Sequence, residues 1–429
     1  MISEFIVAAG WENDTTIGTC KVERVRGNER ISFEYDKNWL QQHPDLLLDP
    51  DLVQTTGPQY VTDKKCFGFL SDVAPDRWGR KLMERSEIEL SKKEHRVPVN
   101  LMESDYILRV SDRTRQGGIR LFSKEGFVYS DNKPNDIPPI SDIRKLESAA
   151  LRLENNDPDV DRWIAQLIEP GSSLGGARPK ANIIDTDGSI WIAKFPSKND
   201  DINVGAWEMI CHELAAMCGL SVPRARLLSL SEHGDTFLVE RFDRSGDKRH
   251  HFASAMTMLG ETDGSENTSS YLDLVDIVEK ICKNSIENDL HELWRRMIFN
   301  ICVGNTDDHL RNHGFVLKDN EWHLSPVYDV NPSADKPFLS LTIDGKDCSK
   351  SLDTAMSVYE YFRISKETAM NDIARIKDTV MSYRNVLESK YHISQNEIRR
   401  VKDAFSAADG ILPTCMQHRE YHKENPRIK

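Results

Sequence analysis

Short polar side chains gather in the segment Gly304–Asn312, which reads GNTDDHLRN. The preceding stretch, Leu293–Val303, has apolar residues at helical spacing and predicts a buried helix. Taken singly, Asp and Asn are more often turn or capping residues. In that role we expect Asp308 to be solvated and His309 to support the loop by hydrogen bonding. Two aspartates, a histidine and two asparagines within nine residues exceed what one turn needs, so they are candidates for chemistry.

A magnesium site and a base can be built from this segment and the one that follows it. The pattern strand, turn, strand at Gly314–Leu324 predicts a hairpin that returns Pro326–Val330 to the side of the segment. Asp329 would then approach Asn312, and these hard oxygen donors suit Mg²⁺, which prefers one or two carboxylates together with phosphate and water. Asp307 would be left to orient and deprotonate an acceptor hydroxyl, a division of labour found in kinases.

A glycine-rich stretch supplies the other half of a phosphoryl-transfer site. It is PGSSLGGARPK, Pro170–Lys180, whose adjacent glycines would let backbone N–H groups approach phosphate, although most such loops are ordinary turns. Lys194 follows on a predicted strand, Ser189–Ser197, and Glu208 on a predicted helix, Asn203–Gly219. In kinases a strand lysine holds the α- and β-phosphates, and a helix glutamate holds that lysine. The alternative, a solvated strand residue and a solvated helix flank, must be invoked separately for each position.

These residues are distributed over three predicted regions, namely residues 1–130, 142–244 and 245–429. The first mixes predicted strands, such as Ile31–Asp36, with a predicted helix at Pro75–Leu90. Between the first two, Ser130–Ser141 carries three prolines and predicts a linker. The second region follows the order helix, glycine loop, strand, helix, strand. The third region is mostly helical, with the predicted hairpin as its interruption.

Composition places the chain among globular proteins. Its 429 residues are 39% hydrophobic and 29% charged, enough for two or three domains with their own cores. The formal charge of −13 argues against broad nucleic-acid binding. Eight scattered cysteines without a CxxC pair indicate a reducing compartment. The N-terminus lacks the basic region of a signal peptide, and no apolar run is long enough for a membrane span. We expect a soluble, cytoplasmic protein that does not enter a membrane.

Seven motifs extend this pattern over nearly the whole chain. They are FGFLSDVAPDRWGRKLMER (Phe67–Arg85), RQGGIRL (Arg115–Leu121), SSLGGARPK (Ser172–Lys180), WIAKF (Trp191–Phe195), FLVERFD (Phe237–Asp243), NTDDHLRN (Asn305–Asn312) and PVYD (Pro326–Asp329). Together they resemble the motifs of the HipA family of bacterial serine/threonine kinases, the toxin halves of toxin–antitoxin pairs. The resemblance implies an α+β, protein-kinase-like two-lobed fold. An additional N-terminal α/β subdomain would precede it, and its C-terminal lobe would be mostly helical.

The resemblance also implies a role for each site residue, with ATP and Mg²⁺ as cofactors. Asp307 would be the catalytic base and Asn312 and Asp329 the metal ligands, while Glu208 would position Lys194 against phosphate. The nucleotide-binding set would comprise Gly175, Gly176, Ala177, Arg178, Pro179, Lys180, Lys194, Glu240, Arg241, Phe242, His309 and Arg311. In this set the backbone of Glu240–Phe242 would meet adenine. Ser173, or its neighbour Ser172, matches a loop serine whose phosphorylation by the kinase itself would inactivate it.

Partners follow from the same resemblance. The substrate would be a protein, such as an aminoacyl-tRNA synthetase or another translation factor, whose phosphorylation arrests growth. A small helix-turn-helix antitoxin on a separate chain would bind the kinase, and DNA would be contacted only through that antitoxin. Two alternatives stay open: a catalytically idle fold serving as an antitoxin-bound transcriptional co-repressor, and a small-molecule or lipid kinase. The presence of Lys194, Asp307, Asn312 and Asp329 favours an active enzyme, because a scaffold needs no metal site.

Overall fold

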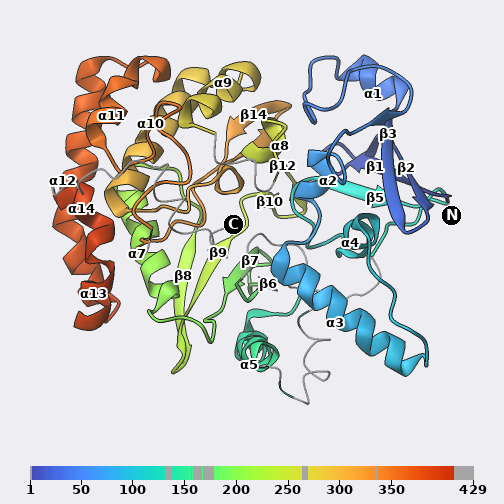
Figure 1. Ribbon diagram of the computed structural model, residues 1–429, viewed down its shortest axis with the longest axis horizontal. Coiled ribbons are helices and arrows are strands. Elements are labelled where there is room, and N and C mark those ends of the chain that lie inside the picture. The colour runs from blue at the N-terminus through green and yellow to red at the C-terminus, as the bar shows by residue number, and fades with distance from the viewer. Residues whose placement is uncertain are drawn as a thin grey trace. The chain divides into compact units, whose positions relative to one another are not determined.

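The computed structural model describes residues 2–130, 137–155, 157, 167, 178–262, 269–333 and 336–409 (Figure 1). Contacts divide the chain into two compact units. Unit 1 comprises Met1–Asp201, Arg224–Ala253 and Val316–Asn320, and unit 2 comprises Ile202–Pro223, Ser254–Phe315 and Glu321–Lys429. The predicted division into three regions is not tested by this grouping and stays a prediction.

Unit 1 begins with a five-stranded antiparallel sheet of order β4-β3-β2-β1-β5. Its strands are β1 (Ile2–Ala9), β2 (Thr15–Val25), β3 (Asn28–Tyr35), β4 (Gln59–Tyr60) and β5 (Ile119–Phe122). The predicted strand at Ile31–Asp36 is confirmed as β3, and its alternating residues Ile31, Phe33 and Tyr35 are buried. Asp36 instead caps α1 (Lys37–Gln42), accepting from the N–H of Asn38.

A second antiparallel sheet of unit 1 has the order β6-β7-β9-β8 and carries the predicted lysine strand. Its strands are β6 (Lys180–Ile184), β7 (Ile190–Lys194), β8 (Ala225–Ser231) and β9 (Gly234–Glu240). One face of the sheet buries Trp191, Ala193 and Leu238 in a core shared with Trp78 of α3 (Arg77–Lys93) and with α5 (Ile143–Glu154). The helix predicted at Pro75–Leu90 is thereby confirmed. The other elements of this part are α2 (Gly68–Asp72), α4 (Glu103–Arg109), η1 (Ile140–Asp142), β10 (Arg244–Ser245), β11 (Lys248–Arg249) and β12 (His251–Ser254).

Unit 2 is mostly helical, as predicted for the C-terminal region. Its central helix is α10 (Ile286–Val303), which packs against α9 (Tyr271–Ile281), α12 (Lys366–Lys390) and α14 (Ser406–Asp409), and α12 also packs against α7 (Val204–Met217) (Figure 1). The shorter elements are α8 (Ala255–Met258), η3 (Leu310–Asn312), α11 (Leu352–Ser357), η4 (Tyr359–Phe362), α13 (Gln395–Val401) and η5 (Lys402–Phe405). No helix among the described residues is long and apolar enough to cross a membrane.

The predicted hairpin is present as β13 (Gly314–Lys318) and β14 (Glu321–Leu324). Asp319 and Asn320 join the two strands, and both have a positive φ, 50° and 62°. Two consecutive residues in this conformation form the two-residue turn that matches the twist of paired strands. The chain therefore reverses directly after the polar segment Gly304–Asn312.

Candidate active site

The polar segment begins where α10 ends. Gly304 closes the helix with φ 65°, and a Cβ built on it would lie 2.1 Å from the carbonyl oxygen of Ala404. Any other residue would therefore be strained in the backbone and would collide with the C-terminal chain. The buried helix predicted at Leu293–Val303 is confirmed, since all but the half-buried Arg295 are buried. The position at which the polar segment begins is therefore fixed by the end of α10.

The two adjacent aspartates of this segment have opposite environments. The Asp307 side chain is 57% exposed, and its Oδ1 lies 3.2 Å from Nζ of Lys336. Asp308 is fully buried and accepts hydrogen bonds from the hydroxyl of Tyr271 at 2.8 Å and from the N–H of Ser340 at 2.7 Å. Burial raises the pKa of Asp308 to about 6. The expectation that Asp308 is solvated is wrong, because it anchors the loop from inside.

The segment that follows the hairpin returns to the loop, as predicted. The hydroxyl of Tyr328 donates to the carbonyl of Arg311 at 2.8 Å, and the N–H of Ser333 donates to the carbonyl of Gly304 at 2.9 Å. Asp329, next to Tyr328, is half-buried and has φ 57°. Asp tolerates this left-handed conformation better than most residues, and such outliers often occur at functional sites.

Asn312 and Asp329 offer the donor chemistry that magnesium needs. The Asn312 side-chain nitrogen donates to the carbonyl of Asp307 at 2.7 Å, so its amide oxygen is the atom that could coordinate a cation. Within the described ranges, no group of three or more His, Cys, Asp and Glu side chains could hold a metal ion. An amide oxygen and one carboxylate would therefore need phosphate and water to complete the shell, which is the arrangement that Mg²⁺ prefers.

His309 and Arg311 flank the same loop and are both half-buried. His309 Nε2 lies 3.8 Å from Oδ2 of Asp307, and its buried Nδ1 has no hydrogen-bond partner among the residues that the structure describes. Arg311 contributes its carbonyl to Tyr328. The structure thus brings five predicted residues into one loop and its returning segment, namely Asp307, His309, Arg311, Asn312 and Asp329.

The glycine loop is described only at its end, in unit 1. Ser172, Ser173, Gly175, Gly176 and Ala177 lie outside the described residues. Arg178 holds both carboxylate oxygens of Asp200, at 2.5 and 2.6 Å, and the carbonyl of the buried Pro179 accepts from the N–H of Phe195 at 2.9 Å. Lys180 is the first residue of β6 and is 3% exposed, with its Nζ 3.2 Å from Oδ2 of Asp76. Both cations therefore already have carboxylate partners within this chain.

Lys194 lies at the end of β7, opposite Lys180 on β6 and Phe237 on β9. Its Nζ is 5.9 Å from the centre of the Phe237 ring, a cation–π contact. Two like charges directly opposite one another across strands are unfavourable unless anions balance them. Asp76 supplies one such anion, with its Oδ2 3.2 Å from Nζ of Lys180.

Glu208 lies on α7 in unit 2 and is 5% exposed. The alternative of a solvated helix flank is therefore wrong for Glu208. A buried carboxylate requires hydrogen bonds or a cation, because transfer of an unpaired charge out of water is costly. Its predicted role in positioning Lys194 stays a prediction.

The predicted adenine-binding backbone is only partly available. The N–H of Glu240 donates to the carbonyl of Arg224 at 2.9 Å, and the N–H of Arg241 donates to the carbonyl of Ile190 at 3.0 Å. Each N–H is therefore occupied by sheet bonding. These two N–H groups are therefore not offered to a ligand, and the expectation that backbone groups of Glu240–Phe242 meet adenine stays a prediction. The Phe242 ring is half-buried and packs 5.9 Å from that of Phe252.

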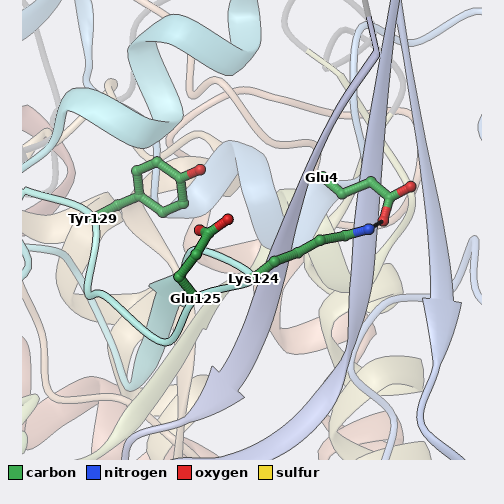
Figure 2. Close-up of a pocket in the computed structure, with 4 residues that line it drawn as sticks. All are labelled: Glu4, Lys124, Glu125 and Tyr129. Carbon is green, nitrogen blue, oxygen red and sulfur yellow. Dashed lines mark ion pairs between the residues drawn. The ribbon is translucent and has the colours of Figure 1, made fainter.

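A separate cavity of about 290 Å³ in unit 1 contains none of the predicted site residues (Figure 2). It is lined by Glu4, Lys124, Glu125 and Tyr129. Figure 2 shows Lys124 reaching Glu4, with which it forms an ion pair. The lysine is thus already neutralised, and the lining has no arrangement that suggests chemistry.

Family models match two parts of the chain. Residues 172–386 match the HipA-like C-terminal domain, and residues 10–97 match the HipA N-terminal domain. The first match covers half of the chain and includes every predicted site residue. The chain belongs to the HipA family.

Solved and sequenced relatives agree with this assignment. The chain is similar in fold to the Shewanella oneidensis structure of a HipA, HipB and operator DNA toxin–antitoxin complex, with a TM-score of 0.64 and 16% identity over 95% of this chain and 97% of that one. "Putative kinase Y4dM" of Sinorhizobium fredii is 24% identical over 52% of this chain and 54% of its own length. The S. oneidensis "Serine/threonine-protein kinase toxin HipA" is 23% identical over 45% and 50%. The chain spans about half the length of these two relatives, and the α+β, kinase-like fold class is confirmed.

Two features of this HipA-family chain escaped sequence reasoning. Asp308 is an internal anchor, and its partners Tyr271 and Ser340 lie 37 and 32 residues away, so no local spacing could reveal them. Lys336, beside Asp307, belongs to a segment without periodicity and gave no signal. Both depend on how the chain after the hairpin returns to the loop, which only the folded chain shows.

Proposed function

We propose that this chain is an ATP- and Mg²⁺-dependent serine/threonine protein kinase that acts as the toxin of a toxin–antitoxin pair. The observation that carries the proposal is the contrast between Asp307 and Asp308. One carboxylate is buried and holds the loop, and its neighbour is exposed on the same loop beside Asn312. Asp308 already stabilises the loop, so the loop does not need the exposed carboxylate of Asp307 for its stability.

In this mechanism Asp307 orients the hydroxyl of the protein substrate and accepts its proton. The oxygen of that hydroxyl forms a bond to the γ-phosphorus of ATP, while the bond from that phosphorus to the bridging oxygen breaks and ADP leaves. Asn312 and Asp329 would hold Mg²⁺, which would supply neutralisation of charge on the phosphate oxygens. Lys194 would hold the α- and β-phosphates, with Glu208 positioning it, and backbone groups of Glu240–Phe242 would meet adenine.

The partner proposal rests on the solved relative, which was determined with HipB and operator DNA. We infer a small helix-turn-helix antitoxin on another chain, with DNA contacted through it, and a translation-related protein as substrate. The seven cysteines within the described residues are free and buried. This supports a location in the reducing cytoplasm, where thiols do not pair.

Self-inactivation through a loop serine belongs to the same proposal. A phosphate on Ser173, or failing that on Ser172, would add a charge of about −1.5 to −2 next to the site of the nucleotide phosphates. It would compete for the loop N–H groups and for the cations Arg178 and Lys180. Mass spectrometry after incubation with Mg·ATP should find this phosphate in the wild type and not in Asp307→Ala. A phospho-form that binds ATP as well as the unmodified protein would contradict the mechanism.

The deciding experiment is transfer of radiolabelled γ-phosphate from ATP into a bacterial lysate, with Asp307→Ala as control. A labelled protein band that requires Asp307 supports the proposal. A labelled small molecule instead would identify a small-molecule or lipid kinase. No label, together with tight binding of a small DNA-binding partner, would identify an idle fold that acts as co-repressor.

A further inference from the structure

Two segments of unit 1 are bound to each other through hydrogen bonds. The segment Glu240–Phe242 is called the hinge, and the loop Asp112–Gly118 is called the anchor loop. We infer that the anchor loop positions the hinge for the nucleotide base, with Asp243 as the central positioning residue. The inference rests on the proposed function, because it assumes that the hinge meets a nucleotide.

Asp243 is the point where the two segments meet. It is buried, and its carboxylate accepts from Arg241 Nε at 2.9 Å and Nη2 at 2.6 Å, from Arg244 Nη1 at 2.9 Å and from the N–H of Gly117 at 2.7 Å. Burial by itself would raise the pKa of Asp243, but the two guanidinium groups outweigh it and hold this pKa far below its ordinary value. The carboxylate is therefore ionised, and its hydrogen bonds are charge-assisted.

The two arginines also bind the backbone of the anchor loop. Arg241 donates to the carbonyls of Thr114 at 2.6 Å and Arg115 at 3.1 Å, and Arg244 donates to those of Arg115 at 2.6 Å and Gly117 at 2.9 Å. A guanidinium group presents its donors in a rigid plane, so several simultaneous acceptors fix its orientation. The remaining contact of Arg241 is with Oδ1 of Asn182 on β6, at 2.9 Å. The arginine that lies within the hinge is thus fixed from two sides.

Close packing fixes the far end of the anchor loop. Gly117 has φ 72°, and a Cβ there would lie 2.9 Å from the backbone nitrogen of Phe252 on β12. A Cβ on Gly118 would lie 2.5 Å from the Trp11 ring, which stacks on His251 at 4.8 Å with an angle of 5° between the rings. These contacts account for the Gly-Gly pair, because only glycine permits such an approach. The anchor loop therefore cannot shift without disturbing β12.

The consequence falls on Phe242, the last residue of the hinge. It stands between Arg241 and Asp243, and both neighbours are held by the anchor loop. The direction of its peptide groups is therefore set from outside the nucleotide site. Adenine and guanine differ in the donor and acceptor pattern of their base edge, so a small rotation of these peptides should change which base is accepted.

The test compares Asp243→Asn with a matched control, Glu87→Gln. Glu87 is also a buried carboxylate that holds two arginines, Arg96 and Arg109, and one backbone N–H, that of Val99. It lies on α3 and makes no contact with the hinge among the described hydrogen bonds. Dissociation constants for ATP and GTP are measured by calorimetry on the full chain, together with thermal unfolding midpoints. Both variants should lower the midpoint, because each removes a buried charge from its cationic partners.

Asp243→Asn should weaken ATP binding by about tenfold or more and reduce the preference for ATP over GTP. Glu87→Gln should leave both quantities unchanged. If the two variants weaken ATP binding equally and leave the ratio of the ATP and GTP dissociation constants unchanged, the network has only a structural role and the inference is overturned. If Asp243→Asn does not fold, Arg244→Lys is used in its place. Lysine keeps the positive charge but cannot donate to the carbonyls of Arg115 and Gly117 as the guanidinium group does. An unchanged ATP-to-GTP ratio in Arg244→Lys would equally overturn the inference.

Failure of the proposed function has a different signature. A wild type that binds ATP but transfers no phosphate contradicts the kinase proposal, while the binding comparison still tests the hinge. A wild type that binds neither nucleotide overturns both. Transfer by the wild type with equal behaviour of the two variants overturns only the role of the anchor loop.

Discussion

Two segments use the same residue types in opposite ways: the proposed catalytic loop, Gly304–Asn312, called the catalytic loop below, and the hinge with the two residues that follow it, Glu240–Arg244, called the hinge segment. In the catalytic loop, Asp307 is exposed and the loop is held from inside by Asp308 and by backbone hydrogen bonds. In the hinge segment, Arg241 and Asp243 are buried and satisfy one another and the anchor loop. A charged residue in a motif is therefore not by itself evidence of a catalytic role. What distinguishes the two regions is whether the carboxylate is exposed to water, as at Asp307, or enclosed by cations and backbone donors, as at Asp243.

The largest expected effect tests the exposed side of this comparison. Asp307→Ala should lower the rate of phosphoryl transfer by about 10²–10⁴-fold, the contribution of a positioned general base. ATP affinity and the unfolding midpoint should stay close to wild type, because the side chain is 57% exposed. Turnover, nucleotide affinity and thermal unfolding are measured in parallel, with the exposed Asp353→Ala of α11 as control. Near wild-type turnover would remove Asp307 from the mechanism.

The next effect tests the buried aspartate of the same loop. Burial raises the pKa of Asp308 to about 6 in the folded chain, against about 3.9 when unfolded. Between these values the folded state binds more protons than the unfolded state, so this group makes the chain less stable as the pH rises. A shift of about two pKa units corresponds to about 3 kcal/mol. The free energy of unfolding of the wild type relative to Asp308→Asn should therefore fall by about this amount from about pH 3 to pH 7.

Denaturant unfolding at several pH values checks this prediction, with the exposed Asp353→Asn as control for the general effect of removing a carboxylate. A difference between wild type and Asp308→Asn that does not change with pH would mean that Asp308 is not held in a desolvated site. The contrast between the two neighbouring aspartates would then fail.

Sequence reasoning predicted what depends on local pattern. The helix that ends at Gly304, the hairpin Gly314–Leu324 and the lysine strand were all foreseen, because apolar periodicity and turn residues act over a few positions. The burial of Asp308 was not foreseen, since it depends on Tyr271 and on the returning chain. The occupied N–H groups of the hinge were missed for the same reason. Strand pairing decides them, and a single sequence does not give the partner.

A third prediction concerns Asp329, the carboxylate of the proposed magnesium site. Asp329→Asn should weaken Mg²⁺-dependent nucleotide binding by about tenfold or more, because it removes one negative charge from a hard oxygen site. Asn also tolerates a positive φ, so the backbone at φ 57° should keep its shape. Titration of Mg·ATP and of metal-free ATP against both proteins separates metal binding from folding. Equal metal dependence would reduce Asp329 to a turn residue.

The smallest expected effect tests the hinge side of the comparison. The Glu240 carboxylate pairs with Arg224 at 2.5 and 2.6 Å, and the Arg224 side chain is 57% exposed. An ion pair this accessible to water contributes little to stability, because water screens it. Because the nucleotide would meet only backbone here, Glu240→Gln should leave ATP affinity within about twofold of wild type, a change of under 1 kcal/mol. Arg224→Gln is the matched control, since it breaks the same pair from the other side.

If Glu240→Gln alone weakened ATP binding strongly while Arg224→Gln did not, the glutamate side chain would itself contact the nucleotide. The hinge would then resemble the catalytic loop, with an exposed carboxylate facing the ligand, and the distinction between the two regions would no longer hold.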